Sequence, residues 1–556
     1  MRGLKLWQLC ILHGKYTHSM ASQMSGGDMV FARFRRVKDV QHRSPTITAM
    51  GWSEAIADGD VQIPDRSDIM RAWLDAEWGH CSDLQTRELE VAGENITLVW
   101  LRGLVDLVRL ESGILQPLAQ VSRRRIQMND LVSILYTVNI REISTKSQLN
   151  AAVADGQVVL WMRGKSQALV LDVSDAPGRS INKAENEPTL EGPQEAFIEQ
   201  LDKNLALLRK RIRSPRLKAE SVRVGEYSNS TVCVVYIEGI AKPTLVQEAM
   251  RRIHNISVDG LNDINKLREL IGDAPFTLFP TTEETERPDR VCGNLLQGRI
   301  AIMVDGSPNC LLVPAQFIHF LVAVDDYYFH YTLTLFIRML RHVAYWTSLL
   351  LPALYVALLS YNQDLLPTPL LVTVAAQHRG IPFPTIIEAL LMLMVFEVLR
   401  EAGTRLPRAV GQSVSIVGTL IVGDSAVRAG LVSPGMVIVI AGTGVASFAL
   451  PAYGFVNSSR LIQFAFVVAA GICGLVGILI LSLILVTHLV SLRSFGVPYM
   501  APIAPFSWSD MKDMFIRAPW FAMKRRPTHL ETVNQVSNRT PVPKQKKASG
   551  WDLSES

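Results

Sequence analysis

Six ionisable residues lie within apolar stretches of the chain, where charge is costly and therefore points to function. They are Glu388, Glu397, Arg400, Glu401, Asp424 and Arg428. The first four share one predicted helix, and the last two form an i,i+4 pair. Rings of acidic side chains in a symmetric oligomer select cations, so these residues are candidates for an ion path.

Two interpretations of these residues stay open. In the first, one or more of the acids lines a cation path, and Glu388 is the better candidate because no basic residue is near it in sequence. In the second, Glu397, Arg400 and Asp424 form internal ion pairs that hold a helical bundle together. Both interpretations require that the surrounding apolar segments cross a membrane.

The elements that position these residues are five apolar segments: 343–363, 370–399, 409–432, 436–453 and 461–490. The last one runs for thirty residues without Asp, Glu, Lys or Arg. A helix of that length is about 45 Å long, whereas the hydrocarbon core of a bilayer is about 30 Å thick. The sequence therefore predicts an integral membrane protein with an α-helical transmembrane bundle of about four to six spans.

The charges of the loops conflict with a straight path for the last span. The loop at 362–369 has no Lys or Arg and is expected on the far side of the membrane, whereas three arginines at the end of the next segment place that end on the near side. Continued along the chain, this alternation carries the basic C-terminal tail across the membrane, against the positive-inside rule. Either residues 370–399 lie partly in the membrane plane, or residues 461–490 bend back.

Small residues mark where helices could bend or pack closely. The candidate hinge or packing glycines are Gly442, Gly444, Gly471, Gly474 and Gly477. The last three lie inside the final apolar segment, so a reversal of the chain is expected there. The first two form a Gly-x-Gly that follows no strand of a βαβ unit, which argues against a nucleotide-binding loop.

The first half of the chain is charge-rich and contains an internal repeat. Apolar strands end in turn glycines at Gly103 and Gly164, and the same pattern returns at Gly239 and Gly306. Strands that alternate with amphipathic helices predict an α/β region, here two similar subdomains of about 140 residues each.

Composition sets the expected boundaries along the chain. We expect a poorly ordered extension (residues 1–65), a first α/β subdomain (66–173), a linker (174–195) and a second α/β subdomain (196–325). The transmembrane helical domain (326–495), an interfacial segment (496–522) and a disordered basic tail (523–556) follow. The linker is polar and rich in Pro and Gly. Trp508 and Trp520 stand among charges in the interfacial segment, which is typical of a chain lying at a membrane surface.

Residues 280–306 carry a distinctive local pattern. Thr281 and Glu284 have the spacing of a capping box and predict the start of a helix, Gly298 predicts its end, and a strand follows. The acidic residues of this stretch suit a helix N-terminus and need no metal ion.

Composition argues against several classes of function. The formal net charge is +5 without a basic stripe interleaved with aromatic residues, so no nucleic-acid partner is expected. The six cysteines have no CxxC spacing and are expected to be free thiols. No catalytic triad, metal-ligand spacing or P-loop is present, so we expect neither an enzyme nor a cofactor nor a bound metal. The short apolar run at the N-terminus is broken by Gln8, which argues against a cleaved signal and for a cytoplasmic soluble half.

Three long stretches resemble the GerA-type spore germination proteins, the A subunits of nutrient germinant receptors: residues 204–241, 280–308 and 382–434. In the second stretch, PTTEETERPDRVCGNLLQGRIAIMVDGSP, the matching residues are Glu283, Glu284, Glu286, Arg287, Pro288, Asp289, Arg299, Asp305 and Gly306. One departure is the stretch EGPQEAF, in which Glu191 and Gln194 stand where the family usually has arginines.

The resemblance implies a multi-pass protein of the spore inner membrane, with the N-terminal domain and the C-terminal tail in the cytoplasm. It implies a transporter-like, nutrient-sensing B subunit and a lipoprotein C subunit as partners, beside the lipid bilayer. It also implies a homo-oligomer that forms an ion channel opened by nutrient. Two other functions stay open, a secondary carrier with the intramembrane acids as coupling sites and a non-conducting scaffold.

Overall fold

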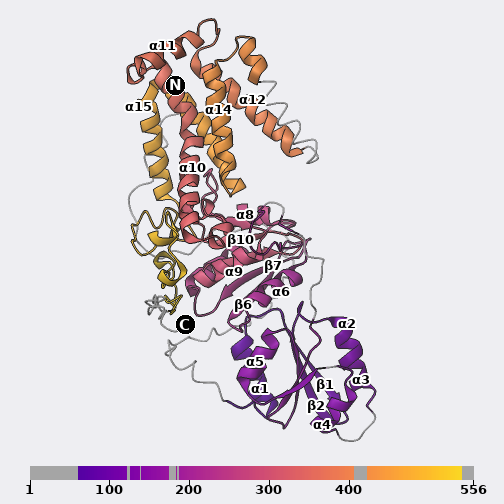
Figure 1. Ribbon diagram of the computed structural model, residues 1–556. Helices are drawn as coiled ribbons and strands as arrows, with labels where there is room; N and C mark the ends of the chain where they lie inside the picture. Colours follow the sequence, from indigo (N-terminus) through magenta and orange to yellow (C-terminus); the bar gives the residue numbers. More distant parts are fainter. Residues whose placement is uncertain are drawn as a thin grey trace, which may run out of the picture. The chain divides into compact units, whose positions relative to one another are not determined.

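The computed structural model describes residues 61–121, 126–137, 139–174, 183–184, 187–405 and 423–540. Two five-stranded antiparallel sheets form the soluble half (Figure 1). The first sheet has the strand order β1-β2-β4-β5-β3, and the second has the order β6-β7-β9-β10-β8. The two sheets thus repeat one strand order, as the spacing of the turn glycines predicts.

The elements of the two subdomains follow in a similar order, with more short helices between the second and third strands of the first. In the first they are α1 (Ser67–Trp78), β1 (Leu84–Val91), β2 (Glu94–Leu101), α2 (Leu107–Leu110), α3 (Gln116–Ala119), α4 (Met128–Ile134), β3 (Ile140–Ile143), α5 (Lys146–Ala154), β4 (Val158–Met162) and β5 (Ala168–Leu171). In the second they are α6 (Leu201–Arg211), β6 (Leu217–Val224), β7 (Ser230–Ile237), α7 (Pro243–His254), α8 (Ile264–Ile271), β8 (Glu283–Thr285), α9 (Pro288–Gln297), β9 (Ile300–Val304) and β10 (Cys310–Val313).

Each sheet is buried on both faces. Successive side chains of a strand point to opposite sides of the sheet, so each strand contributes to two cores. In β2, Val99 and Leu101 belong to one core together with Trp78 of α1, whereas Leu98 belongs to a second core together with Leu110 of α2. The strands of the second sheet divide their side chains between two cores in the same way. The predicted α/β class of the soluble half is confirmed.

A strand-edge contact and a buried ion pair join the two subdomains. Cys81 forms a parallel bridge with Ala219 of β6, and Ser82 N donates to Ala219 O at 2.8 Å. Arg209 of α6 donates from Nε and Nη2 to the two carboxylate oxygens of Asp83, both at 2.9 Å, and both side chains are buried. This pair closes the interface with two opposite charges that water cannot reach.

The helical region consists of α10 (Tyr331–Ser360), α11 (Thr368–Gln377), α12 (Thr385–Arg405), α14 (Pro434–Phe448) and α15 (Tyr453–Ser491). A single hydrophobic core runs through α10, α12, α14 and α15 and continues into the soluble segment around Phe317. Two described helices, Tyr331–Ser360 and Gly454–Ser491, are long and apolar enough to cross a bilayer. The bundle of four to six spans therefore stays a prediction.

Helix α15 reverses its direction at Gly474, whose backbone is non-helical (φ 63°, ψ −141°). Phe279 of the soluble half lies 6.1 Å from Phe455 and 6.4 Å from His488, measured between ring centroids. A straight helix would separate those two residues by about 50 Å, so the chain doubles back. Of the two alternatives left open by the loop charges, the described structure has the one in which the final apolar segment bends back.

The end of α10 caps the break in α15. Leu475 N donates to Asn362 Oδ1 at 3.2 Å, and Tyr361 Oη donates to Gly471 O at 3.0 Å. A broken helix leaves amide and carbonyl groups without partners, and these two side chains satisfy one of each kind. The reversal is therefore held by contacts from another helix.

The other predicted glycines serve close packing. A Cβ atom would meet Phe396 at Gly444, Ile386 at Gly471 and Ala469 at Gly477, at 2.0–2.3 Å in each case. Gly442 differs, because nothing lies within 4 Å of a Cβ placed there.

The capping-box prediction for Thr281 and Glu284 is wrong. Residues Glu283–Thr285 form the edge strand β8, which pairs with β10, and α9 begins only at Pro288. The pairing of β8 with the sheet overrides the local helix signal. The predicted end of that helix at Gly298 is confirmed, with φ at 98°.

Two predicted disordered segments are shorter than expected. Ile63 is buried and Gln62 bridges to Thr145, so order begins before residue 66. In the predicted tail, Arg526 donates to Leu296 O at 2.6 Å and Val533 N donates to Ile240 O at 3.2 Å. Residues 1–60 and 541–556 lie outside the described residues.

Removing Arg209 should destabilise the soluble half, because Asp83 would stay buried without a counter-charge. We expect Arg209→Met to lower the free energy of unfolding by about 3–5 kcal/mol. The control is Arg213→Met, which breaks an exposed pair with Asp155 and should cost less than about 1 kcal/mol. Urea unfolding of the full chain in detergent, followed by tryptophan fluorescence, measures both; equal losses would contradict the prediction.

Gly474→Ala should destabilise the helical region. Its backbone conformation is open almost only to glycine, and a Cβ would lie 2.8 Å from both Asn362 Oδ1 and Tyr361 Cβ. Backbone strain of this kind costs about 1–3 kcal/mol, and the clash adds to it. Gly442→Ala is the matched control and should raise the melting temperature slightly, since Ala is the better helix former. Thermal unfolding in detergent tests the pair, and a Gly474→Ala protein as stable as wild type would exclude the reversal.

Candidate functional site

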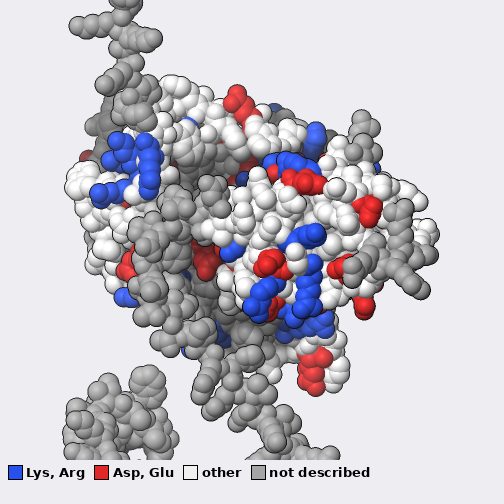
Figure 2. All heavy atoms as spheres, turned by 90° about the horizontal axis from the view of Figure 1, so that it is seen from below, with Lys and Arg blue, Asp and Glu red and all other residues white. Residues whose placement is uncertain are grey.

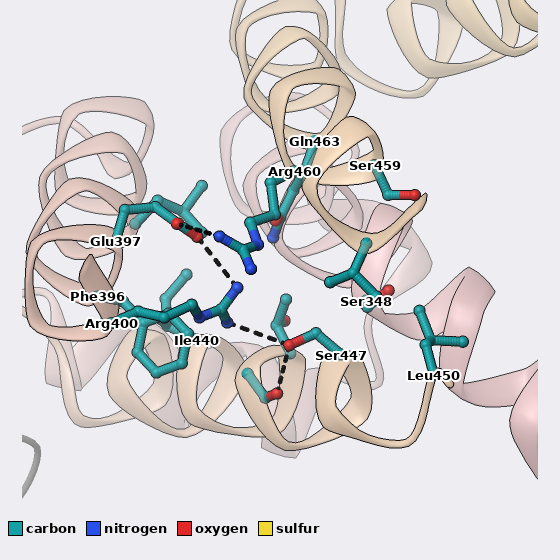
Figure 3. A pocket seen from close by; sticks show the side chains of 14 residues that line it. Ser348, Phe396, Glu397, Arg400, Ile440, Ser447, Leu450, Ser459, Arg460 and Gln463 are labelled. Carbon is teal, nitrogen blue, oxygen red and sulfur yellow. Dashed lines mark hydrogen bonds and ion pairs between the residues drawn. The ribbon is translucent and has the colours of Figure 1, made fainter. Parts of the chain in front are cut away.

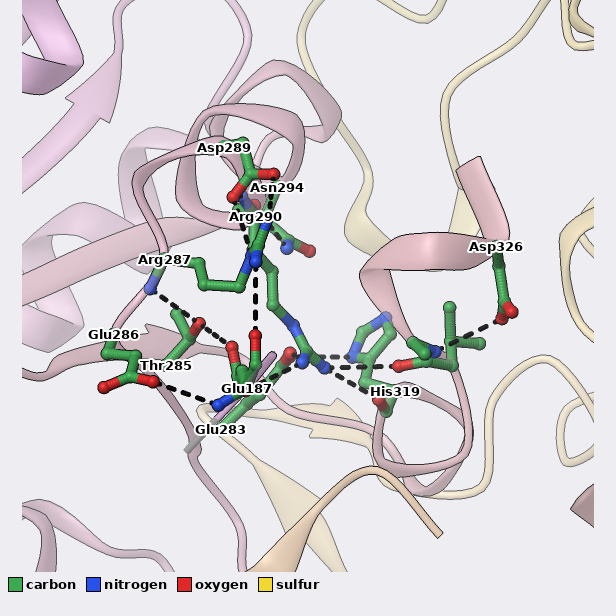
Figure 4. Close-up of polar contacts among 12 residues, drawn as sticks. Glu187, Glu283, Thr285, Glu286, Arg287, Asp289, Arg290, Asn294, His319 and Asp326 are labelled. Carbon is green, nitrogen blue, oxygen red and sulfur yellow. Dashed lines mark hydrogen bonds and ion pairs between the residues drawn. The ribbon is translucent and has the colours of Figure 1, made fainter. Parts of the chain in front are cut away.

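Two arginines of the 280–308 stretch converge on one buried carboxylate. Glu283 of β8 is only 3% exposed, and its two oxygens bind Arg290 Nη2 at 2.6 Å and Arg299 Nη1 at 2.5 Å. Figure 4 shows Glu283 beside Arg290. Arg290 also binds Glu187 Oε1 at 3.0 Å, and Thr285 Oγ1 donates to Glu187 Oε2 at 2.6 Å. The network ties α9, β9 and the chain before α6 to the edge strand of the second sheet.

Arg287 holds the chain that enters the second subdomain. It is fully buried and binds Asp289 Oδ2 at 2.7 Å, and it donates to the carbonyl oxygens of Glu187 at 3.2 Å and Pro193 at 2.7 Å. Tyr328 Oη donates to the same Asp289 oxygen at 2.6 Å. The motif arginine thereby fixes the end of the linker against the segment that leads to α10. Glu191 and Gln194, which replace arginines of the family pattern, are exposed.

The remaining motif residues have structural partners as well. Glu284 binds Arg268 and Asn309, Glu286 accepts from the backbone of Glu187, and Asp305 accepts from the backbone of Leu201. Pro288 is the first residue of α9, and Gly306 turns the chain with φ at 87°. Within the described residues, no group of three His, Cys, Asp or Glu side chains is placed to hold a metal ion, and the described cysteines are free.

Glu283 stays ionised although it is buried. Burial raises the pKa of Glu283, but the positive charges of Arg290 and Arg299 outweigh it and lower the pKa to about 2. Burial lowers the pKa of His319 well below its usual value, with Arg299 acting in the same direction. His319 is therefore neutral, and its Nδ1 accepts from Gln316 N at 3.2 Å.

A second buried ion cluster lies at the base of α10. Asp326 binds Arg338 Nε at 3.0 Å and Arg341 Nη1 at 2.9 Å, and Arg338 Nη1 binds Asp513 Oδ1 at 3.0 Å. Arg290 of the first network donates to the carbonyl oxygens of His319 and Val322, a few residues before Asp326. The segment 319–326 therefore connects the second sheet to the first turns of α10.

The face of the molecule seen in Figure 2 carries charges of both signs. Where described residues are visible on that face, Lys and Arg side chains are interspersed with Asp and Glu.

The structure separates Glu388 from the other acids of α12. Glu388 is fully buried, and its Oε1 accepts from Ser433 N and Ser433 Oγ, each at 2.5 Å. Its Oε2 lies 3.4 Å from His378 Nε2. Ser433 is the N-cap of α14, where the helix dipole favours a negative charge. Glu388 thus joins α12 to the start of α14 within one subunit.

Glu397 and Arg400 lie in a cavity between α10, α12, α14 and α15 (Figure 3). Glu397 binds Arg460 Nη1 at 3.1 Å and Arg400 Nη1 at 3.5 Å, and Arg400 Nη2 donates to Ser447 Oγ at 3.1 Å. Arg460 lies between the apolar segments 436–453 and 461–490, so the sequence pattern does not mark it as an intramembrane residue. In the structure it lies within α15, seven residues after the start of that helix.

The two remaining pairs are exposed. Glu401 binds Arg405 at 2.7 Å with side chains 63% and 79% exposed, and Asp424 binds Arg428 at 2.9 Å with side chains 54% and 79% exposed. The six candidates therefore fall into a capping acid, a cavity cluster and two exposed pairs, which within the described residues lie at separate places.

Replacing Glu283 should cost stability in a pH-dependent manner. Its folded pKa of about 2 lies below the unfolded value of about 4.5, so its stabilisation is complete above pH 4.5 and lost as the pH falls through 2. We expect Glu283→Gln to lower the free energy of unfolding at pH 7 by about 3 kcal/mol, and the difference from wild type to shrink below pH 4.5. Urea unfolding between pH 2 and 8 measures this. Glu88→Gln, in an exposed pair with Arg71, is the control and should change little; a pH-independent loss would contradict the assignment.

Comparison with known proteins gives one consistent result. The chain matches the family model described as Bacillus/Clostridium GerA spore germination protein over residues 72–529. It is 38% identical to spore germination protein KA of Bacillus subtilis strain 168, over 84% of this chain and 88% of that protein. It is 36% identical to spore germination protein GerLA of Bacillus cereus, over 85% of this chain and 96% of that protein.

Among solved structures, the N-terminal domain of the A subunit of the Bacillus megaterium spore germinant receptor GerK3 is 28% identical. The match covers 46% of this chain and 97% of that one, with a TM-score of 0.36. The sequence identities and the family model extend over the soluble half and the helical region alike. The chain therefore belongs to the GerA family of spore germination proteins and, within it, to the A-type subunits.

Proposed function

We propose that this chain is the membrane subunit of a nutrient germinant receptor and that several copies form a nutrient-gated cation channel. The observation that carries the proposal is the set of ionisable side chains inside apolar helices, since such residues are retained where they serve an ion path or its gate. The role in germination follows from membership of the family. Ion conduction and the formation of an oligomer go beyond family membership and are proposed.

Exposed apolar faces support an assembly in a bilayer. Large side chains of α10 lie open on the isolated chain, among them Phe336, Met339 and Val343, all more than half exposed. The second arm of α15 leaves Leu479 and Leu483 open in the same way. Lipid and neighbouring copies of the chain are the two surroundings that would cover these faces.

A path between copies needs acids that face outward from each copy. Glu388 is fully buried within its own subunit, whereas Glu401 and Asp424 are more than half exposed. In a symmetric ring, exposed acids of equivalent copies can face a common axis. We therefore assign the cation path to Glu401 and Asp424 and give Glu388 a supporting role.

The reversal of α15 supports the proposed orientation. Both arms end beside Phe279, so the chain after Ser491 starts on the same side as the soluble subdomains. The basic residues that follow, Lys524 to Arg526, then share that side, as the positive-inside rule requires of a cytoplasmic face. We propose a cytoplasmic N-terminal domain and tail in the inner membrane of the spore.

The buried clusters suggest how the gate is coupled. Nutrient sensing is proposed to reside in a partner B subunit, with a lipoprotein C subunit as the third component. A displacement of the second sheet would reach α10 through Arg290, the 319–326 segment and Asp326. No step of this proposal requires catalysis, a cofactor or a metal.

Conduction can be tested with the receptor complex in proteoliposomes. Wild-type complex should show nutrient-triggered potassium efflux, and the double variant Glu401→Gln, Asp424→Asn should lower the efflux and its selectivity for cations several-fold. Glu88→Gln is the control, because that acid lies on the soluble half. Saturable, gradient-coupled uptake without current steps would favour a carrier.

Two results would overturn the channel. One is normal ion release after both acids are neutralised, which would leave a scaffold. The other is a strictly monomeric A subunit on chemical cross-linking, since the proposed path requires a ring of copies.

A further inference from the structure

The buried acid Glu388 uses only one of its two carboxylate oxygens in hydrogen bonds to the described residues. Its side chain is fully buried, and its Oε1 accepts from the backbone N–H and from the hydroxyl group of Ser433. Its Oε2 is shielded from water as well, and within the described part of the chain no hydrogen-bond donor reaches it. A buried oxygen in this state destabilises the fold until a donor or a cation meets it.

The group that faces this oxygen is a ring nitrogen of His378, at the end of α11. His378 Nε2 lies 3.4 Å from Glu388 Oε2, and it too is buried without a hydrogen bond to any described residue. The other ring nitrogen, Nδ1, lies 3.0 Å from the carbonyl oxygen of Val374. A carbonyl oxygen can only accept, so Nδ1 carries a hydrogen, and Nε2 of the neutral ring is then an acceptor.

Two acceptors therefore face each other, and one added proton turns their contact into a hydrogen bond. Without that proton the pair is an anion inside an apolar bundle, a costly state that the N-terminal dipole of α14 offsets only in part. With the proton the pair is neutral. Because Ser433 holds Oε1 from two sides, the free position is at Oε2. We propose that Glu388 and His378 form a binding site for one proton, held between Oε2 and Nε2.

The charged groups of the surrounding helices are engaged away from this pair. Helices α11 and α14 contain no Asp, Glu, Lys, Arg or His. Those of α10 lie in the first half of that helix, around Asp326, and those of α12 beyond Glu388 start nine residues further along, at Glu397. In α15, Arg460 binds Glu397, and His488 lies at the end of the second arm.

Four further titratable groups lie close to the pair in the chain or in space. Arg379 is exposed, and Asp424 and Arg428 bind each other at exposed positions before α14. Tyr355 of α10 lies against the first turn of α14, and a phenol is uncharged near neutral pH. None of these groups donates to Glu388 Oε2. The missing hydrogen is therefore assigned to a bound proton.

The bound proton would fasten α11 to the rest of the bundle. Glu388 of α12 already holds the N-cap of α14 through Ser433, and the proton adds His378 at the end of α11 to the same chain of contacts. None of the ten residues of α11 is buried, so this helix has few other contacts to hold it. The attachment of α11 then depends on pH. This inference goes beyond the proposed channel and holds whether or not the chain conducts ions.

Glu388→Gln tests the site because it imitates the protonated acid. Its amide oxygen can accept from Ser433, and its NH₂ group can donate to His378 Nε2 at every pH. A proton that binds the folded chain stabilises it by mass action, so wild type should lose this stabilisation as the pH rises. In detergent, the two full-length chains should melt at the same temperature at about pH 5, and Glu388→Gln should melt about 2–4 °C higher at about pH 9.

The control and a second measurement separate proton binding from general effects of pH. Asp364→Asn removes an exposed acid of the same helical region, and its difference from wild type should be the same at every pH. Amide hydrogen exchange gives the local readout, since α11 should exchange faster in wild type than in Glu388→Gln at high pH and equally at low pH. A difference between wild type and Glu388→Gln that does not vary with pH, or a Glu388→Gln chain that is less stable than wild type at about pH 9, would overturn the proposal.

Discussion

A carboxylate removed from water must be matched by cations, and Glu283 is where this requirement organises the most structure. Its two oxygens are held by arginines from two different elements, Arg290 of α9 and Arg299 of β9. Arg299 depends on it most, because Glu283 is its acidic partner and a lone guanidinium in the protein interior costs several kcal/mol, whereas Arg290 also binds Glu187. The carboxylate therefore joins the edge strand, a helix and a central strand into one unit, and through Arg290 it reaches the chain that enters α10.

The helical region depends on a different requirement, which is that no backbone polar group be left without a partner in hydrocarbon. The reversal at Gly474 exposes such groups, and Tyr361 and Asn362 at the end of α10 satisfy two of them. The same interaction that permits the break also positions it. A helix that could otherwise run straight is divided into two arms of about 25–30 Å, close to the thickness of a hydrocarbon core.

The Glu283 network and the two arms of α15 lie close to the same region of the soluble half. Phe279 contacts both arms of α15, and Phe317 packs edge-on against Phe455 with the ring centroids 5.3 Å apart. The base of α10 is held nearby by Asp326 and its arginines. Movement of the second sheet is thus tied to α10 and α15 by packed aromatic rings and by buried ion pairs, both of which resist small continuous displacement.

Sequence alone determined the α/β class, the internal repeat, two helices long and apolar enough to cross a bilayer, and the family, because these depend on local periodicity, on glycines at turns and on long motifs. Loop charges left two alternatives open, and among the three glycines of the final apolar segment only the structure places the reversal at Gly474. Tertiary structure decided the rest. Arg209 stands in a run of six cations, and only the fold shows that this one reaches Asp83. Glu284 has a capping-box spacing, yet its strand pairs with β10. Glu397 finds Arg460 sixty-three residues away. Ion pairs between residues that are distant in the chain leave no local sequence pattern. Their stabilising free energy depends on both side chains being buried side by side, which only the fold decides.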